Sequence, residues 1–407
     1  MSFDLAKELE LCADHLKPFM FEKETTHEAS SKPDTPNTDT LTFPSIITGA
    51  AGDFATVYGE HLEPPKQFFF MAFLTCLGNI LAGRLILKSE LPVEPRLYTL
   101  ILGESADDRK STAISKTVDF FREAVPDFPV CYGLGSAEGL QRVLEKSANV
   151  LIVFDEFKSF VSKSKIDGSV LLPCTTSLFE TTRYESCTKT HTINLPNAHL
   201  SILAASTTDT YERTWDNSFT AIGFTNRLFL VAGSGQRKNA FPERISSPDR
   251  RWLMNRLGEV LTHVGQRLEL GISDEARSLY TDWYLALPQS VHTKRLDAYA
   301  MRLMMLLAVN DLKKFIDEEI IVKVITLCDW QYRVRRLHDP IDADSNMAKV
   351  EERIRRSIGE GGKNDRDLRR AVHANRTGLW VYDSALKNLQ KANEIIWDKS
   401  KKMWVTT

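Results

Sequence analysis

The sequence lacks any apolar run long enough to cross a lipid bilayer. Its most apolar stretch, residues 67–83, is interrupted by Thr75 and Asn79. This stretch falls short of the roughly 20 residues that a membrane-spanning helix needs. The first residues also lack the basic segment followed by an apolar one that marks a secretory signal. We therefore expect a cytoplasmic protein with no membrane partner.

Cysteine is scarce and irregularly spaced. The six cysteines of the 407-residue chain form no Cys-x-x-Cys pair, and no histidine lies at metal-ligand spacing from them. We expect reduced thiols, most of them in the core.

No excess of glycine, proline or charge points to a fibrous or disordered chain. With 20 Gly, 16 Pro, 43% hydrophobic and 26% charged residues, the composition is that of a globular protein. The length predicts two or three domains, at roughly 100–200 residues each. The net charge of −2 divides unevenly, because residues 347–407 carry 14 Lys and Arg against 8 Asp and Glu. A basic end on an acidic body is expected to contact a polyanion mainly at that end.

Composition divides the chain into six segments. Residues 1–22 predict a short amphipathic helix, and residues 23–42, rich in Thr, Ser, Glu and Pro, predict a flexible linker. The others are a helical leader (43–96), a segment that alternates apolar runs with helical stretches (97–246), a helical segment (247–340) and a basic C-terminal module (347–407).

The alternating segment predicts an α/β fold. Short apolar runs that are expected to form strands occur at residues 97–102, 130–132, 150–154, 200–205 and 228–231. Several of these runs are continuously apolar, which is typical of strands buried on both faces of a parallel sheet, with helices as the crossover connections.

The first predicted strand leads through a loop into a helix that begins with lysine. Residues 97–112 read LYTLILGESADDRKST, which is the layout of a phosphate-binding loop. In such a loop, backbone N–H groups and a helix N-terminus face the phosphates, Lys110 reaches the β/γ oxygens, and the hydroxyl of Ser111 holds Mg²⁺. Gly103, Arg109 and Thr112 complete the expected nucleotide contacts.

The loop departs from the usual spacing of this motif. It is one residue longer, Arg109 replaces the glycine before the lysine, and Asp107 and Asp108 place two carboxylates near a site for anions. The alternative is an ordinary strand–helix turn with a chance Lys-Ser-Thr.

A second strand ends in two acids. Residues 149–157 read NVLIVFDEF, the form of a Walker B element. In that element the first carboxylate, here Asp155, orders Mg²⁺ and the second, Glu156, polarises the attacking water. The alternative is an acidic pair that caps the next helix. The position about 45 residues after the loop favours the Walker B interpretation, because a sheet of crossover units produces such a separation.

Later segments carry groups that could approach a bound nucleotide. The strand at 200–205 runs into hydroxyl residues, of which Thr207 is the preferred sensor of the γ-phosphate and Ser206 the reserve. Arg227 precedes a strand and could reach a neighbouring subunit's γ-phosphate; the alternative is a surface arginine that caps a loop. Arg295 and Arg302 lie seven apart on one face of a predicted helix, so both could approach the nucleotide from a helical lid.

These blocks resemble the ATPase core of minichromosome maintenance helicases. In the loop they are more similar to the P-loop ATPase module of primase-helicase and replication proteins of plasmids, phages and genomic islands. That second group has a lengthened loop of the form G-x-x-x-x-x-R-K-[ST], which the segment from Gly103 to Ser111 matches. The resemblance covers roughly residues 43–340.

The other blocks carry the resemblance in chain order. The helicases' Asp-Glu-Phe matches Asp155-Glu156-Phe157, and their sensor 1 matches Ala204-Ala205-Ser206-Thr207. Their Ser-Arg-Phe arginine finger matches Asn226-Arg227-Leu228. Their sensor-2 helix matches Arg295 with Leu296-Asp297 and Arg302. In sensor 1, threonine replaces asparagine.

The resemblance implies an AAA+-type P-loop ATPase with a helical lid. It implies ATP and Mg²⁺ as cofactors, a homo-oligomeric ring, and a separate primase or replication initiator as a possible further partner. In the related helicases the interval that corresponds to residues 184–200 forms a hairpin in the ring's pore. Lys189 and His191 are therefore candidates for contact with single-stranded DNA, and the alternative is a solvated surface hairpin.

The last 61 residues predict three helices and a strand pair, an arrangement that resembles a winged helix-turn-helix. Its third helix, at residues 381–392, would expose polar side chains toward duplex DNA: Ser384, Lys387, Asn388 and Lys391. Winged helices also dock proteins, so that alternative stays open.

Three hypotheses follow. The first is an ATP-dependent DNA helicase or DNA-remodelling motor that acts as a ring in the replication of a mobile genetic element. The second is a nucleotide-switched origin-recognition or regulatory DNA-binding protein with little or no ATP turnover. The third is a nucleotide-independent scaffold.

Overall fold

The computed structural model describes most of the chain after residue 40. The described residues are 41–104, 108–187, 192–215, 219, 222–339, 346–359 and 362–407. The predicted amino-terminal helix and most of the predicted linker lie outside them.

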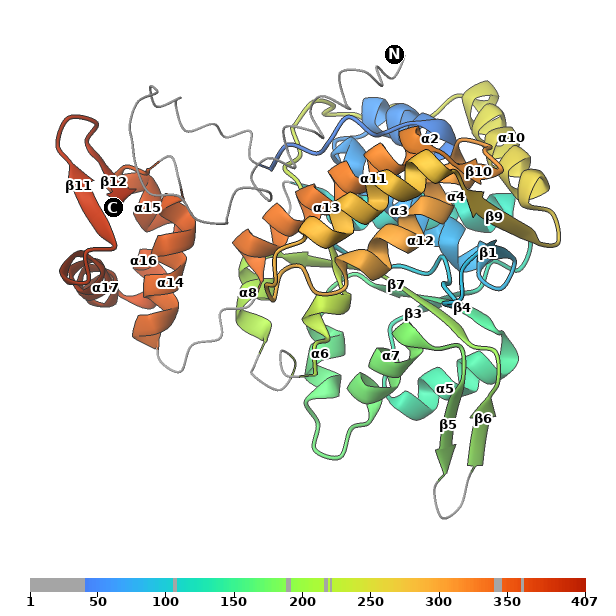
Figure 1. Cartoon of the computed structure of the whole chain (residues 1–407), viewed down its shortest axis with the longest axis horizontal. Coiled ribbons are helices and arrows are strands. Elements are labelled where there is room, and N and C mark those ends of the chain that lie inside the picture. The colour runs from blue at the N-terminus through green and yellow to red at the C-terminus, as the bar shows by residue number, and fades with distance from the viewer. Residues whose placement is uncertain are drawn as a thin grey trace.

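A five-stranded parallel sheet forms the centre of the structure, which confirms the α/β expectation (Figure 1). Its order is β3-β4-β7-β2-β8, and every neighbouring pair is parallel. The strands are β2 (Tyr98–Gly103), β3 (Val130–Tyr132), β4 (Asn149–Phe154), β7 (His199–Thr207) and β8 (Phe229–Ala232). Each of the five predicted apolar runs forms one of them. Every residue of β2 is buried, as expected of a central parallel strand.

Helices cover both faces of this sheet (Figure 1). Helices α3 (Lys66–Leu81) and α4 (Lys110–Ala124) contact β7 and β2 on one face, while α5 (Ala137–Lys146) and α7 (Leu171–Glu180) lie on the other. Helix α3 follows two prolines and is apolar on all sides. It is buried against α2 (Gly49–His61), α4 and the sheet, which fits the rule that a helix without a polar face lies in a core.

The helical segment after the sheet contains two strands that the sequence pattern did not predict. Strands β9 (Leu268–Ile272) and β10 (Phe315–Ile316) join β1 (Leu85–Leu87) in a small parallel sheet of order β1-β9-β10. Their short length and mixed burial leave no continuous apolar run. The helices of this segment are α10 (Ser247–Val264), α11 (Asp274–Ala286), α12 (Leu296–Asn310) and α13 (Glu318–His338).

The C-terminal residues have an apolar core of their own. Helices α14 (Asn346–Ile358), α15 (Asp365–Ala371), α16 (Ala374–Thr377) and α17 (Leu379–Lys391) precede the antiparallel pair β11 (Ile395–Asp398) and β12 (Met403–Thr406). Their apolar cluster, which includes Ile354, Leu368 and Leu386, is separate from the large cluster of the preceding residues. The three expected helices and the strand pair are present, and the short α16 is an addition.

No helix in the described part of the chain is both long and apolar enough to cross a membrane. The described cysteines form no disulfide with one another, and Cys76, Cys174 and Cys328 are buried. Strands β5 (Tyr184–Cys187) and β6 (Thr192–Leu195) form an antiparallel hairpin that extends away from the central sheet (Figure 1).

Candidate functional site

The candidate site lies at the carboxyl ends of three adjacent strands. Strand β7 lies between β2 and β4, and the register pairs Gly103 with Thr207 on one side and Phe154 with Ala204 on the other. The loop after β2, the end of β7 and the acids after β4 are therefore neighbours. In open parallel sheets, ligands bind at this edge.

Lys110 is the first residue of α4, and its side chain is turned back onto the preceding loop. Its Nζ donates hydrogen bonds to the carbonyl oxygens of Gly103 (3.1 Å) and Glu104 (2.6 Å). Burial lowers the pKa of Lys110, and the negative charges of Asp108, Glu104 and Glu156 oppose that shift. A buried ammonium beside a helix N-terminus favours the binding of an anion there.

Asp108 braces the loop and is not directed at an anion. Its side chain is buried; Oδ1 accepts a hydrogen bond from the Gly235 N–H at 2.6 Å, and Oδ2 accepts one from the Glu104 N–H. A Cβ at Gly103 would lie 2.5 Å from Asp108 Oδ2, which explains the glycine. The Asp108 carboxylate, whose charge would disfavour a phosphate in this loop, is thus bound by two backbone N–H groups. Asp107 lies outside the described residues.

Arg109 has left-handed backbone geometry, with φ of 49°, and points toward the leader segment. Its Nε donates to Glu63 Oε2 at 3.0 Å, and this hydrogen bond lowers the pKa of Glu63. The residues from Arg109 to Thr112 nevertheless line a cavity of about 200 Å³ at the start of α4. The structure therefore places four of the five nucleotide contacts predicted in the loop segment around one cavity. The fifth, Gly103, does not line it, but its carbonyl oxygen accepts a hydrogen bond from Lys110.

The acids that follow β4 are exposed and do not cap a helix. Asp155 and Glu156 lie in a turn before α6 (Lys158–Ser164), whose N-terminus receives no side-chain cap. The capping alternative is therefore wrong. The turn is anchored by Phe157, which is buried and whose N–H donates to Ala205 O at 2.8 Å.

The two hydroxyl residues at the end of β7 have different partners. Ser206 is buried, and its Oγ lies within donor distance of two acceptors, Thr207 O at 3.2 Å and Glu156 Oε1 at 3.5 Å. The Thr207 hydroxyl accepts the Thr210 N–H at 3.1 Å and donates to Thr210 Oγ1, so it caps α8 (Thr208–Thr214). The reserve candidate, and not the preferred one, is thus the hydroxyl that faces the acidic pair.

Ser111 and Asp155 supply the oxygen donors that Mg²⁺ prefers, and both are exposed at this edge. Within the described ranges, no group of three or more His, Cys, Asp or Glu side chains could hold a metal ion by itself. The donor set therefore fits a magnesium ion whose remaining ligands are phosphate oxygens and water.

Arg227 lies at the amino ends of the strands, opposite to the candidate site, and its hydrogen-bond partners belong to its own chain. It follows Thr225 and Asn226 in a short 3-10 helix, η2 (Thr225–Arg227), just before β8. Its side chain is buried; Nε and Nη2 lie 3.2 and 3.1 Å from Glu180 Oε1, and Nη1 donates to the carbonyl oxygens of Ile222 and Gly223. Arg227 is therefore not a surface residue, but it does bind carbonyl groups of the preceding loop, as the alternative supposed.

Arg295 shares the Glu180 carboxylate, with Nη1 3.0 Å from Oε1. It precedes α12 and remains half-exposed. Because this carboxylate also binds Arg227, Arg295 lies with Arg227 and not with Lys110. We predicted that Arg295 approaches the nucleotide from a helical lid; it lies instead beside Arg227, away from the candidate site of its own chain.

Arg302 is a buried structural residue. Its guanidinium donates to the carbonyl oxygens of Arg96 and Phe179, both at 2.6 Å, and lies 3.8 Å from the centre of the Phe179 ring. Burial and the charge of Arg96 lower the pKa of Arg302 to about 10. Arg96 precedes β2, whereas Lys110 follows the other end of that strand. The prediction that Arg302 binds the nucleotide is therefore wrong.

The predicted DNA contacts are distributed over two elements. Lys189 and His191, at the tip of the β5–β6 hairpin, lie outside the described residues. On α17, Lys387, Asn388 and Lys391 are exposed and Ser384 is half-buried. Asn388 donates to Glu351 Oε1 of α14 at 2.8 Å, so part of its hydrogen-bonding capacity is used within the module.

Sequence reasoning missed Glu180, which ends α7 and binds both arginines, and Glu63, which orients Arg109. Neither lies in a recognisable motif. It also missed a cavity of about 640 Å³ in the C-terminal module, lined by charged residues of α15 and the following turn. Three arginines within residues 366–370 were the available signal for that cavity.

A scan against protein-family models gives no match, and neither does a search of curated proteins.

Proposed function

We propose that the central sheet and its flanking helices form a P-loop ATPase core of the AAA+ type. Its proposed activity is ATP hydrolysis that drives the unwinding or remodelling of DNA, as a helicase or DNA-remodelling motor of a mobile genetic element. One observation carries the proposal: the lysine-led helix, a serine and an acidic pair meet at the carboxyl ends of β2, β7 and β4.

The residues of this edge have complementary roles in the proposal. The N-terminus of α4 and Lys110 bind the phosphates of ATP, which replace the loop carbonyls as partners of Nζ. Ser111 and Asp155 hold Mg²⁺, which neutralises phosphate charge. Glu156 orients the attacking water, and Ser206 fixes the carboxylate of Glu156.

The C-terminal module is proposed to be a winged helix-turn-helix that binds duplex DNA. Support comes from the three main helices around one apolar core, the antiparallel pair β11 and β12, and the exposed lysines of α17. The hairpin of β5 and β6 is proposed to contact single-stranded DNA in the pore of a homo-oligomeric ring in the cytoplasm. A separate primase or initiator would complete the replication machinery.

One observation favours the second hypothesis, a nucleotide-switched DNA-binding protein with little turnover. Arg227 is buried and its donors are bound to Glu180 and two carbonyl groups of its own chain. In this arrangement it is not free to neutralise charge on a neighbour's γ-phosphate, so a subunit held this way would bind ATP and hydrolyse it slowly.

Steady-state ATP hydrolysis, measured at increasing protein concentration with and without single-stranded DNA, separates these functions. The motor predicts turnover that rises per subunit with concentration and with DNA. The switch predicts tight ATP binding with turnover that neither variable changes. Absence of ATP binding would contradict both.

A further inference from the structure

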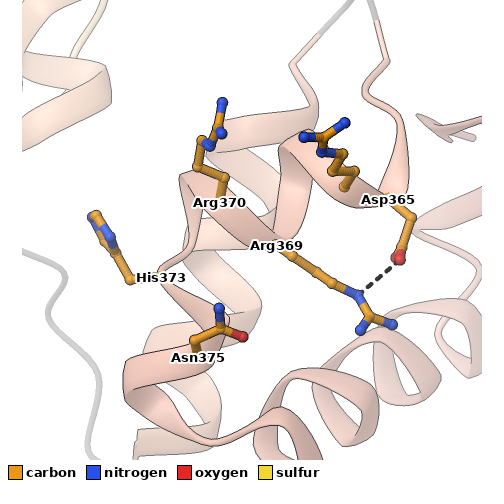
Figure 2. A pocket seen from close by; sticks show the side chains of 6 residues that line it. Asp365, Arg369, Arg370, His373 and Asn375 are labelled. Atoms are coloured by element: carbon orange, nitrogen blue, oxygen red, sulfur yellow. Dashed lines mark ion pairs between the residues drawn. The ribbon is translucent and has the colours of Figure 1, made fainter.

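The cavity of the C-terminal module has a basic wall on its second helix. It is lined by Asp365, Arg366, Arg369, Arg370, His373 and Asn375 (Figure 2). These residues belong to α15, to the turn that follows it and to α16. None of them lies on α17, the helix that the sequence pattern favours for DNA contact.

Asp365 is the one carboxylate among the residues that line the cavity, and its partners lie within the module. Asp365 pairs with Arg369 at 2.8 Å and accepts hydrogen bonds from Tyr382 Oη at 2.9 Å and Trp404 Nε1 at 3.3 Å. The same contacts tie α15 to α17 and β12. Arg369 is thereby directed away from Arg370, as Figure 2 shows, and the charge of this pair is largely neutralised.

Arg366 and Arg370 are left as the excess charge of the cavity. Both are exposed, and no acidic side chain in the described part of the chain forms an ion pair with either. They lie four residues apart, where like charges on a helix destabilise it by roughly 0.2–0.5 kcal/mol. No ion pair among the described residues offsets this repulsion, which an external anion would relieve.

Two further polar groups border the same space. The Asn375 side chain of α16 also lines the cavity (Figure 2). His373 has left-handed backbone geometry at the turn, and its Nε2 lies 3.9 Å from Asp209 Oδ1 of α8. The wall thus presents an amide donor and two guanidinium groups that form no ion pair with any described residue.

We infer that this cavity binds the phosphodiester backbone of duplex DNA through Arg366 and Arg370. The inference rests on the proposed DNA-binding function and adds a contact surface distinct from α17. Guanidinium groups match phosphate geometry by two parallel hydrogen bonds, whereas a lysine acts as a point charge. Two arginines four residues apart on a helix, about 6 Å of rise, can contact neighbouring phosphates of one strand.

The test compares three double variants of the full chain in duplex DNA binding at several salt concentrations. Arg366→Gln with Arg370→Gln removes the cavity charge. Lys387→Gln with Lys391→Gln removes the lysines of α17. Arg122→Gln with Lys146→Gln removes the same charge from exposed positions on α4 and α5 and controls for net charge.

We expect the arginine variant to bind duplex at least about 10-fold more weakly at low salt. The slope of log K against log salt should fall by about 2, at roughly 0.9 per lost phosphate contact. Its melting temperature should be equal to or slightly above that of the wild type, because the repulsion between the two arginines is removed. Its DNA-independent ATP hydrolysis should be unchanged. The control on α4 and α5 should leave the salt slope as it is in the wild type.

Three results would overturn the inference. An unchanged slope in the arginine variant, with loss in the α17 variant, would assign the backbone contacts to α17 and leave the DNA-binding function intact. Failure of the wild-type chain to bind duplex would remove the proposed function together with the inference. Calorimetric binding of inorganic phosphate that the arginine variant loses, with unchanged duplex binding, would identify a site for a small anion.

Discussion

At the scale of the residue, the structure separates polar groups that look alike in the sequence. Asp108 and Asp155 both follow apolar strands, yet one is buried under two backbone N–H donors and the other is exposed. Arg227 and Arg302 both occur in blocks that resemble ATPase motifs, and both are buried by carbonyl partners. A sequence pattern identifies residue type and spacing, but it does not reveal which donors the fold has already used.

The two hydroxyls of β7 should respond differently to removal. Ser206→Ala is expected to lower ATP turnover about 10-fold with unchanged ATP affinity, because Glu156 loses the group that orients it. Thr207→Val should lose about 1 kcal/mol of stability, since it removes the N-cap of α8, and should leave turnover nearly intact. Steady-state kinetics and thermal unfolding of both variants check this. Lowered turnover in Thr207→Val alone would restore Thr207 as the sensor.

Asp329 makes the stability depend on pH. It is buried and accepts a hydrogen bond from Trp283 Nε1 at 3.0 Å, and burial raises its pKa from 3.8 to about 6. Between pH 4 and 6 the folded chain holds a proton that the unfolded chain has lost. The contribution of this group to stability therefore falls as pH rises through that window.

Asp329→Asn keeps the acceptor for Trp283 and removes the ionisation. We expect the variant to be more stable than the wild type above pH 6, by up to about 3 kcal/mol at 1.36 kcal/mol per pKa unit, and equally stable near pH 4. Denaturant unfolding at the two pH values measures the difference. A gain in stability of the same size at both pH values would show that ionisation is not its cause.

At the scale of the element, the strands of the central sheet were predictable and those of the small sheet were not. The residues of β2 and β7 form continuous apolar runs because both faces are covered. Strands β9 and β10 are short and half-exposed. Only pairings between segments distant in sequence define them, of β9 with β1 and of β10 with β9. The site loop was recognisable from its lysine and helix, whereas the brace from Asp108 to Gly235 depends on a contact across 127 residues.

Removal of the C-terminal module should separate DNA binding from ATP hydrolysis. Deletion of residues 347–407 removes an excess of six positive charges and a separate apolar core. Duplex affinity and its salt dependence should both fall, while ATP hydrolysis without DNA should survive. Fluorescence anisotropy and a coupled ATPase assay measure the two properties. Duplex binding as strong as that of the full chain would make the module a protein-docking domain.

At the scale of the whole molecule, the arginines and the acidic pair lie at opposite ends of the strands of the central sheet. Arg227 and Arg295 lie at the amino ends, whereas Asp155 and Glu156 follow a carboxyl end. Such a placement suits a ring, because Arg227 of one subunit could complete the site of the next. The contacts of Arg227 with Glu180 must then be exchanged on assembly. Residue spacing identified Arg227 as a candidate, but its partner Glu180 lies 47 residues earlier and carries no motif.

Turnover should therefore depend on assembly. Arg227→Ala is expected to bind ATP normally and to hydrolyse it about 1,000-fold more slowly, the lower range for an arginine finger. Mixing Arg227→Ala with Lys110→Ala should restore part of the activity, because one interface pairs an intact Lys110 with an intact Arg227. Turnover per subunit that is independent of concentration, with no rescue among exchanging subunits, would place Arg227 within its own chain.

The central claim is that ATP binds at the N-terminus of α4 and is hydrolysed beside Glu156. ATP affinity and turnover of Lys110→Ala and Glu156→Gln, measured side by side, test it most directly. Lys110→Ala should lose affinity by about 10- to 100-fold, since a hydrogen bond to a charged group contributes roughly 1.5–3 kcal/mol. Glu156→Gln should keep its affinity and lose turnover. Unchanged ATP affinity in Lys110→Ala would contradict the assignment.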